Sequence, residues 1–372
     1  MTTVLTTFKL YTAAGAFLTE VTNCRAYHYI LNCSPGVVGI MELELPTGIN
    51  PTFYAKDMRI GAYRTIDNRP PYLDNNAIYL TETIRFRNTY TLVRAYHATT
   101  LLDRRLVGYV EGSTFADKTT AVAADNLIKT FWKENAGSSI DASRITPTTQ
   151  TDLSAYVTVQ GNLSLGASIA KLAAWRNLLN IAREIAEASA AAGTYVTFEI
   201  MAPSEGTLEL RTYTGQRGVD RRAGSANPVI LRDQSGVFEN AQLEIDYHNE
   251  RTYILAIGRG SFNNILTATS SDTGLIAQSP FGRSEDLMSR KNVYNVTALQ
   301  DDSDSGLWAA RPLITFTGEI TEAENLTRGI HFDVGDIVTA ESPQTKQQYN
   351  VRFDVIEEQD GHAAKALFRS IP

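Results

Sequence analysis

Cysteine is scarce in this chain, and it does not occur in a paired spacing. Only Cys24 and Cys33 are present among 372 residues. They lie in a strand-like segment without the CxxC spacing of a zinc site. A chain of this length is not a small disulfide-dense scaffold, so we expect both cysteines to be reduced and structural.

The sequence also lacks a secretory signal and long apolar runs. The opening stretch, MTTVLTTFKLYTAAGAFLTEV, has no basic n-region, and Lys9 interrupts what would be its apolar core. Nowhere do about 18 apolar residues follow one another, which is the length a membrane helix needs. We therefore expect no secretory signal and no membrane segment.

Positive charge is in deficit. The chain has 34 Lys and Arg residues against 41 Asp and Glu, a net charge of -7. This balance argues against a mainly nucleic-acid-binding or anionic-membrane role, because both need positive potential. Of the 34 basic residues, 25 are Arg. Arginine tolerates desolvation at interfaces, so the excess favours assembly, although codon usage would produce the same excess.

Catalytic signatures are absent from the sequence. It contains no GxSxG, HExxH, GxxxxGK[ST] or GxGxxG motif. The five histidines are His28, His97, His248, His331 and His362, and no two of them are close enough in sequence to share one helical turn. We therefore predict no catalytic residue, metal site or cofactor, and the sequence identifies no binding residue. Glycosidases need only two carboxylates, which sequence cannot exclude among 41 acidic residues.

An acidic run, DDSDSG, invites comparison with a calcium-binding loop. Asp301, Ser303 and Ser305 fall on EF-hand ligand positions, but Pro312 occupies the twelfth position, where Glu is required. We interpret the run as a flexible acidic turn.

A long apolar periodicity organises the middle of the chain. Apolar residues recur at steps of three and four at Ile169, Leu172, Trp175, Leu179, Ala182 and Ala186. This spacing predicts an amphipathic helix that starts at the N-cap Ser168, buries Trp175 and ends at Gly193. The period then changes to two in TYVTFEIM and GTLELRTY, which the loop APSEG joins into a hairpin.

Other segments complete a β-rich pattern. Thr114 and Asp117 fit a capping box for a second helix over 115–134. GVFENAQLEIDY and TYILAIGRG read as a hairpin joined through HNER. We predict an α+β, β-rich fold with a β domain at 1–112, a helical and mixed domain at 113–193, and a second β domain at 194–372 with a variable insertion near 260–310.

Three arginines lie among glycines after the predicted hairpin. Arg217, Arg221 and Arg222 could form a phosphate or polysaccharide site, because Gly-rich backbone with Arg suits anions. The alternative is a solvated loop between strands.

The order of four blocks resembles the tail-hub family (minor tail or baseplate hub proteins) of long-tailed bacteriophages. KLYTAAGAFLTEV followed by GVVGIMELELP is similar to the opening strands of that family. IRFRNTYTLVRAYHATTLLDRRL, AGTYVTFEIMAPSEGTLELRTYTGQRGVDRR and HFDVGDIVTA are similar to its later segments. The residues that carry the resemblance are Leu101, Leu102, Arg105, Gly193, Gly218, Asp220, Arg221, Asp333, Gly335 and Asp336.

The resemblance implies an architecture and a role. It implies two barrel-like β domains flanking smaller insertions. It also implies a trimeric ring at the tail tip of the virion that joins tail-tube and baseplate proteins to tip or receptor-binding proteins, with DNA only passing through and no catalysis. The alternatives are a tail-associated cell-wall or capsule hydrolase, or a carbohydrate-binding tail module. For the last, the first candidates are Trp132, Trp175 and Trp308.

Overall fold

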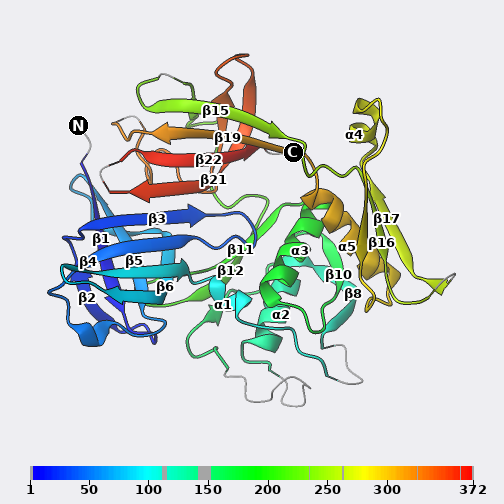
Figure 1. Ribbon diagram of the computed structural model, residues 1–372, viewed down its shortest axis with the longest axis horizontal. Coiled ribbons are helices and arrows are strands. Elements are labelled where there is room, and N and C mark those ends of the chain that lie inside the picture. Colours follow the sequence, from blue (N-terminus) through cyan, green and yellow to red (C-terminus); the bar gives the residue numbers. More distant parts are fainter. Residues whose placement is uncertain are drawn as a thin grey trace.

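A computed structural model gives the fold of the chain (Figure 1). It describes residues 3–110, 115–140, 152–233, 235–261, 264–324, 326–360 and 362–370. Within these ranges, no helix has both the length and the apolar character needed to span a bilayer.

The N-terminal part is a run of antiparallel strands. They are β1 (Val4–Tyr11), β2 (Phe17–Val21), β3 (Ala26–Asn32), β4 (Ile40–Pro46), β5 (Arg59–Ile66), β6 (Tyr72–Phe86) and β7 (Tyr90–His97), with a 3-10 turn at Pro51–Phe53. In β4, Met41, Leu43 and Leu45 are fully buried while Glu42 and Glu44 are partly exposed. This alternation is the period of two expected for a sheet with one covered face.

Strands from residue 220 onward join the same sheet. They are β13 (Asp220–Arg221), β14 (Ile230–Leu231), β15 (Phe238–Asp246), β19 (Leu313–Ile320), β20 (Ile337–Glu341), β21 (Gln348–Gln359) and β22 (Ala364–Ser370). The main path of the 14-stranded sheet is β15-β19-β22-β21-β3-β4-β7-β6-β5-β1-β2, and β20 pairs with β13, β14 and β21. The two ends of the chain therefore meet at the β21–β3 pair, where Ile356 faces Leu31.

One apolar core lies along both parts of this sheet. It unites Phe8, Leu31 and Leu43 from the N-terminal strands with Phe316 and Phe353 from the C-terminal ones. Within the described residues the sheet path runs from β15 to β2 without closing on itself. The β-rich α+β class is confirmed, whereas the expected barrels are not.

The middle of the chain builds a second layer of helices and short strands beside the sheet (Figure 1). Its elements are α1 (Thr100–Asp103), β8 (Asp117–Ala123), α2 (Ala124–Asn135), β9 (Thr158–Val159), β10 (Ser168–Leu172), α3 (Leu178–Ala191), β11 (Val196–Met201) and β12 (Glu209–Thr214). The predicted β11–β12 hairpin is confirmed, with Ile200 opposite Leu210. Gly193 follows α3 with φ +87°, as predicted for a left-handed helix end.

The predicted start of the long helix at Ser168 is wrong. Ser168–Leu172 is the strand β10, and α3 begins only at Leu178, where the Asn177 side chain accepts from the N–H of Asn180. Trp175 lies between them at φ +66° and is 48% exposed, so it is not on a buried face. The error arises because β10 is covered on both faces, so its Ile169 and Leu172 are both buried and mimic helical spacing.

The predicted second helix also starts too early. Asp117 opens β8 rather than a helix, and α2 begins at Ala124 without a side-chain cap. The other half of the expected capping box, Thr114, lies outside the described residues. Thr119 and Thr120 favour the strand that precedes the helix, because β-branched residues fit a pleated surface.

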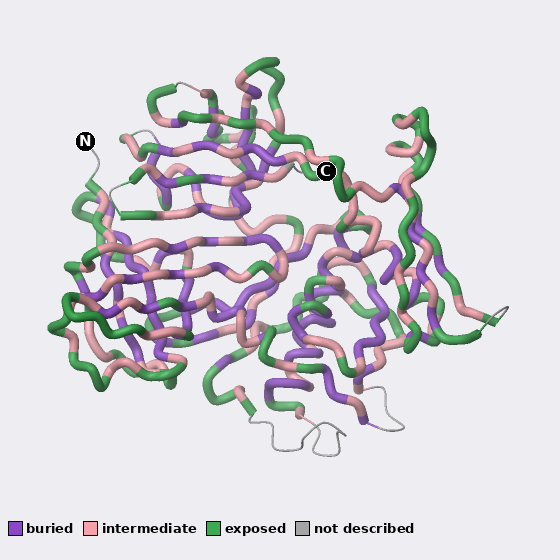
Figure 2. Tube along the Cα trace, in the orientation of Figure 1, coloured by how far each residue is buried: buried purple, intermediate pink, exposed green. Residues whose placement is uncertain are grey.

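An arm projects from the body in the region 253–309 (Figure 1, yellow and orange). It contains β16 (Tyr253–Ile257), β17 (Thr267–Ser271), α4 (Thr273–Gln278), β18 (Glu285–Ser289) and α5 (Val296–Ala309). The strand β16 at the centre of the arm is buried or partly buried, whereas β18 and α4 are mostly exposed (Figure 2). The predicted HNER hairpin is wrong, because β15 pairs with β19 while β16 pairs with β17 and β18.

The acidic run DDSDSG is helical, which corrects the prediction of a flexible turn. It lies inside α5, where Asp302 and Ser303 are buried. Lys171 of β10 forms an ion pair with Asp302 and donates to Glu184 of α3 over 2.5 Å. The run is therefore the face by which α5 attaches the arm to the body.

Candidate functional site: a buried ion network

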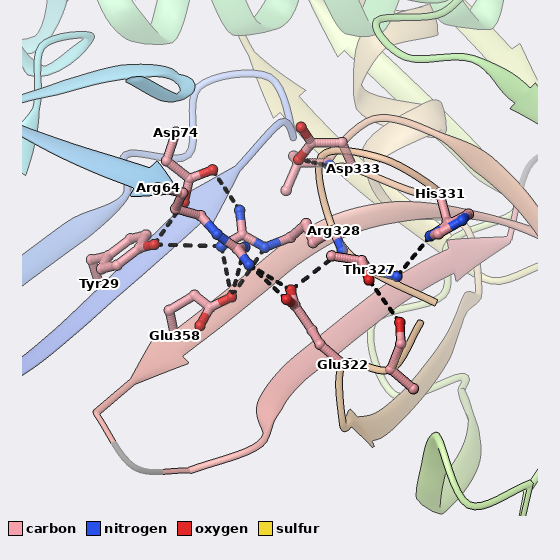
Figure 3. A network of polar contacts seen from close by, with 11 residues as sticks. Tyr29, Arg64, Asp74, Glu322, Thr327, Arg328, His331, Asp333 and Glu358 are labelled. Carbon is pink, nitrogen blue, oxygen red and sulfur yellow. Dashed lines mark hydrogen bonds and ion pairs between the residues drawn. The ribbon is translucent and has the colours of Figure 1, made fainter. Parts of the chain in front are cut away.

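A network of charged side chains fills the space between the N-terminal and C-terminal strands (Figure 3). Tyr29 comes from β3, Arg64 from β5, Asp74 from β6 and Glu358 from β21. Glu322 and Arg328 come from the segment that follows β19. The network thus joins strands that are remote in sequence.

Arg328 occupies the centre of this network. Its Nη1 donates to Asp74 over 2.6 Å, and its Nη2 and Nε donate to Glu358 over 2.6 and 3.0 Å. The Tyr29 hydroxyl donates to the second oxygen of Asp74 over 2.6 Å. Arg328 and Asp74 are buried, so each charge depends on its partners rather than on water.

Arg64 is the second cation of the network. Its Nη2 donates to both Glu322 oxygens, over 2.7 and 2.8 Å, and its Nη1 lies 3.4 Å from Glu358. Burial alone would raise the pKa of Asp74, but the Arg328 and Arg64 guanidiniums outweigh it and hold that pKa below its usual range. The arginine pKa values are raised by the surrounding carboxylates.

This arrangement holds charges in place rather than moving protons. Asp74 stays ionised, and carboxylates already occupy the donors of Arg328. At the edge of the network, burial raises the pKa of Asp333 to about 6. Breaking such a buried pair by removing one partner is strongly destabilising, because the remaining charge is left uncompensated. The ion pairs of the network therefore hold the N-terminal and C-terminal parts of the sheet together.

Two of the sequence motifs meet beside this network. The Asp336 carboxylate accepts hydrogen bonds from the N–H of Val219 (2.6 Å), from Nε of Arg221 (2.7 Å) and from the N–H of Asp333 (2.9 Å). The N–H of Gly218 donates to Gly335 over 3.2 Å. The segments 218–221 and 333–336 are thus clamped together, and β13 continues from there as a parallel partner of β20.

The other motif residues lie apart from this clamp. Asp220 pairs with Arg222 at the surface, where both side chains are more than 40% exposed. Leu102 is buried in α1 while Leu101 is partly buried, and the carbonyl of Arg105 accepts from the N–H of Leu178 at the start of α3. Gly193 ends α3.

The three arginines near these glycines do not form one cluster. Arg217 is largely buried and donates to both oxygens of Glu199, over 2.8 and 2.9 Å. Arg221 binds Asp336 and Arg222 binds Asp220. Each guanidinium therefore has its own carboxylate, which leaves no shared anion site among them.

The described parts of the chain contain a small polar cavity and a larger hollow at the surface of the C-terminal strands. A polar cavity of about 10 Å³ lies between Cys33, His97, Glu199, Tyr213 and Arg217, with room for about one water molecule. A hollow of about 200 Å³ lies over β19, β21 and β22. Over the residues that the structure describes, no three His, Cys, Asp or Glu side chains are placed to hold a metal ion.

Burial shifts the pKa values of His97 and Cys33, which line the small cavity, and of Cys24, which lies elsewhere. The N–H of Thr99 donates to Nδ1 of His97 over 3.3 Å, and burial lowers the pKa of His97 to about 4. Cys33 and Cys24 are both free, as expected, and burial raises the pKa of each thiol to about 12. The thiolate is the nucleophile, so neither cysteine is reactive near neutral pH.

Sequence reasoning missed the ion network. Its members are isolated charged residues in ordinary strands or loops, at Arg64, Asp74, Glu322, Arg328 and Glu358. The one available signal is Arg328 beside Gly329, five residues before the recognised segment 333–336.

Comparison with known proteins identifies relatives of the whole fold. Residues 87–366 match the model of one protein family, described as Siphovirus ReqiPepy6 Gp37-like protein. No curated protein matches the chain in sequence.

Three solved structures resemble the chain over nearly its full length. The prophage tail protein gp18 from Listeria monocytogenes EGD-e is 11% identical, with a TM-score of 0.55 over 97% of this chain and 94% of that one. The tail protein from Neisseria meningitidis MC58 is 12% identical, with a TM-score of 0.54 over 99% and 97%. The 43 kDa tail protein of prophage MuSo2 from Shewanella oneidensis is 10% identical, with a TM-score of 0.54 over 98% of each chain. At these identities the likeness shows a shared fold.

Proposed function

The chain belongs to the Siphovirus ReqiPepy6 Gp37-like protein family, and from this premise we propose that it is a structural subunit of a phage tail. The observation that carries the proposal is the shared fold with three tail proteins, each aligned over at least 94% of its own length. The family and this fold agree with the resemblance to phage tail proteins that the sequence indicated.

The finer proposal is a homotrimeric hub ring at the distal end of the tail. It would join tail-tube and baseplate proteins to tip or receptor-binding proteins and let DNA pass. The two ends of the sheet path support it: among described residues β2 and β15 each have one hydrogen-bonded neighbour. Two different free edges suit a head-to-tail contact, the kind that closes a cyclic ring. Phe17 on β2 is 57% exposed and Ile245 on β15 is 42% exposed.

We also propose the division into domains at 1–112, 113–193 and 194–372, with the arm as the insertion near 260–310. One apolar cluster gathers α2 and α3 and extends to β11 and β12, and a small one packs α5 and the arm strands against β10 of the middle part. The first and last domains share the large sheet. In this division, the ion network holds the first and last domains together.

Molecular mass in solution tests the ring. Light scattering of the purified chain at micromolar concentration should give three times 40.9 kDa. The variant Phe17→Asp on the β2 edge should weaken the oligomer, whereas Phe281→Asp, at an arm residue that is 95% exposed, should leave it unchanged. A monomer at all concentrations would contradict the trimer. Antibody-labelled electron micrographs of intact tails test the position at the tip.

The role proposed here involves no catalysis, and the alternatives have their own tests. A tail-associated hydrolase would reduce the turbidity of host cell walls or release capsule fragments, and one carboxylate substitution would abolish the activity. A carbohydrate-binding module would need exposed aromatic side chains. Trp132 is buried, Trp308 is stacked with Arg311, and Trp175 is exposed, so Trp175 is the residue to substitute in a sugar-binding assay.

A further inference from the structure

Three arginines gather where β21, β22 and the start of β19 meet. Arg352 of β21 and Arg369 of β22 are direct register partners in the sheet. Arg369 also faces Thr315 of β19, and Arg311 lies two residues before that strand begins. Like charges on directly opposite residues of a sheet repel, so this cluster needs anions to hold it.

Among the described residues, Asp354 is the one carboxylate that forms ion pairs with this cluster. Asp354 accepts from Nε of Arg352 over 2.7 Å, and its other oxygen lies 3.3 Å from Nε of Arg369. The Ser34 hydroxyl also donates to that second oxygen, over 2.9 Å. Asp354 is fully buried and both of its oxygens are engaged. It therefore balances one of three positive charges.

Arg311 is left without an acid. Its guanidinium carbon lies 3.1 Å from the centroid of the Trp308 ring, which holds it in place by a cation–π contact. Across the described ranges, none of the ion pairs formed by Asp or Glu side chains involves Arg311. Burial and repulsion from Arg352 and Arg369 lower the pKa of Arg311 to about 10. A partly buried cation among like charges is stabilised when an anion joins it.

All three arginines of the cluster are partly exposed to solvent. The Arg369 side chain is 39% exposed and that of Arg352 is 15% exposed. Leu313, at the start of β19, is 41% exposed beside it. An incoming group can therefore reach the guanidiniums, while Asp354 and Trp308 fix their positions.

We propose that Arg311 and Arg369 bind a carboxylate side chain that a partner protein presents when the tail assembles. The proposal rests on the proposed function and adds the chemistry of one contact. A second carboxylate would place two anions among three cations and could accept paired hydrogen bonds from a guanidinium. Nucleic acid is a poorer candidate, because three arginines on a chain of net charge -7 cannot neutralise a run of phosphates.

A binding measurement with a defined probe tests the site. The probe is a short peptide of alternating Glu and Gly, compared with the same peptide carrying Gln in place of Glu, by calorimetry at low ionic strength. We expect the Glu peptide to bind and the Gln peptide not to bind. The variant Arg311→Gln should weaken binding at least tenfold.

Arg283→Gln is the matched control. Arg283 also stacks on an aromatic ring, with its guanidinium carbon 4.2 Å from the centroid of Tyr253, but it already forms an ion pair with Glu285. This variant should bind the Glu peptide as the wild type does. The proposal is overturned if the Glu peptide fails to bind, if Arg311→Gln binds it unchanged, or if inorganic phosphate or duplex DNA binds this site more tightly than the peptide.

A second readout separates binding from a purely structural role. If Arg311 awaits an external anion, Arg311→Gln should leave the melting temperature of the free chain unchanged or raise it. A clear fall in melting temperature would mean that Arg311 serves the fold of the free chain, and it would overturn the proposal.

The source of the carboxylate is read from the mass of the assembled protein. If a second copy provides it, Arg311→Gln should dissociate the oligomer that light scattering detects for the wild type. If another tail protein provides it, the wild type and Arg311→Gln should have the same mass in solution. The Glu peptide should still bind the wild type more tightly than the variant. Labelling of tails in micrographs reports on the proposed function independently, so a failure of the peptide experiment leaves that result intact.

Discussion

Asp74 and Arg328 are 254 positions apart in the sequence, yet Nη1 of Arg328 lies 2.6 Å from Oδ1 of Asp74. Both side chains are almost completely buried. The pair links β6 to the segment after β19, and Glu358 and Arg64 extend the link to β21 and β5. The stability of the sheet therefore depends on charge neutralisation at one point.

Replacing Arg328 with Met should strongly destabilise the chain. The substitution keeps much of the apolar stem but leaves Asp74 buried without its main counter-ion. We expect a loss of about 3–5 kcal/mol in the free energy of unfolding, measured by urea denaturation. The double variant Arg328→Met with Asp74→Asn should recover part of the loss, because the orphaned charge is gone.

The control for this experiment is Arg222→Met, which breaks an exposed pair with Asp220. We expect a change of at most about 1 kcal/mol there, since surface ion pairs contribute little. An Arg328→Met variant as stable as Arg222→Met would show that the network does not fasten the sheet.

Asp336 should matter far more than Asp220, although both belong to recognised motifs. Asp336→Ala removes the acceptor for two backbone N–H groups and for Arg221. Unsatisfied buried donors are costly, so we expect a loss of about 2–4 kcal/mol in stability. Asp220→Ala removes only an exposed pair and should cost under about 1 kcal/mol. Equal effects in chemical denaturation would argue against the clamp between 218–221 and 333–336.

Two glycines of the motifs should respond differently to a methyl group. A Cβ on Gly218 would overlap both the carboxylate and the backbone nitrogen of Asp336, so Gly218→Ala must force the two clamped segments apart. A Cβ on Gly193 would meet nothing within 4 Å, and the φ of +87° is the only obstacle. We expect Gly193→Ala to lower stability by about 1 kcal/mol and Gly218→Ala by clearly more. Thermal melts of both variants compare the two losses of stability. A larger loss for Gly193→Ala than for Gly218→Ala would contradict the prediction.

His97 should make the chain less stable as the pH falls below neutral. Its pKa is about 4 in the folded chain, whereas an unperturbed histidine titrates near about 6.5. Between these values the unfolded chain binds more protons, so the free energy of unfolding decreases as the pH drops from about 6.5 to about 4. His97→Gln should remove this pH dependence. We expect it to amount to about 2 kcal/mol of unfolding free energy, after allowing for the partial exposure of the side chain.

Comparing variants separates the effect of His97 on the pH dependence of the unfolding free energy from the effects of other titrating groups. Asp333, with a pKa raised to about 6, contributes the opposite slope, because its folded form holds the proton over about pH 4 to 6. The quantity to measure is therefore the difference in unfolding free energy between His97→Gln and the wild type at each pH. The exposed His248→Gln is the control. A difference that does not change with pH would contradict the prediction.

Local patterns predicted part of the fold well. The hairpin of β11 and β12 and the helix end at Gly193 follow from short-range signals, namely period-two alternation and a residue that accepts positive φ. The motif segments 218–221 and 333–336 were recognised separately, and the structure brings them together. No sequence rule places them in contact, since 115 residues separate Arg221 from Asp336.

The failures have one physical origin, which is the tertiary environment. Buried strands such as β10 lose the alternation that distinguishes a strand from a helix, so Ser168 looked like a helix cap. The acidic run at 301–306 looked solvated because its partner Lys171 lies 131 residues away. The same distance problem hid the ion network, whose members carry no local pattern.

The pairing of β21 with β3 determines when the sheet can form during protein synthesis. Strand β3 can pair with β21 only after the ribosome has delivered residue 359, so until then the N-terminal strands keep one edge unpaired. Pairings of this sequence separation form slowly. Synthesis of β21, rather than local collapse, therefore sets the earliest moment at which this pairing can form, and a nascent chain stalled before β21 would expose an edge prone to aggregation.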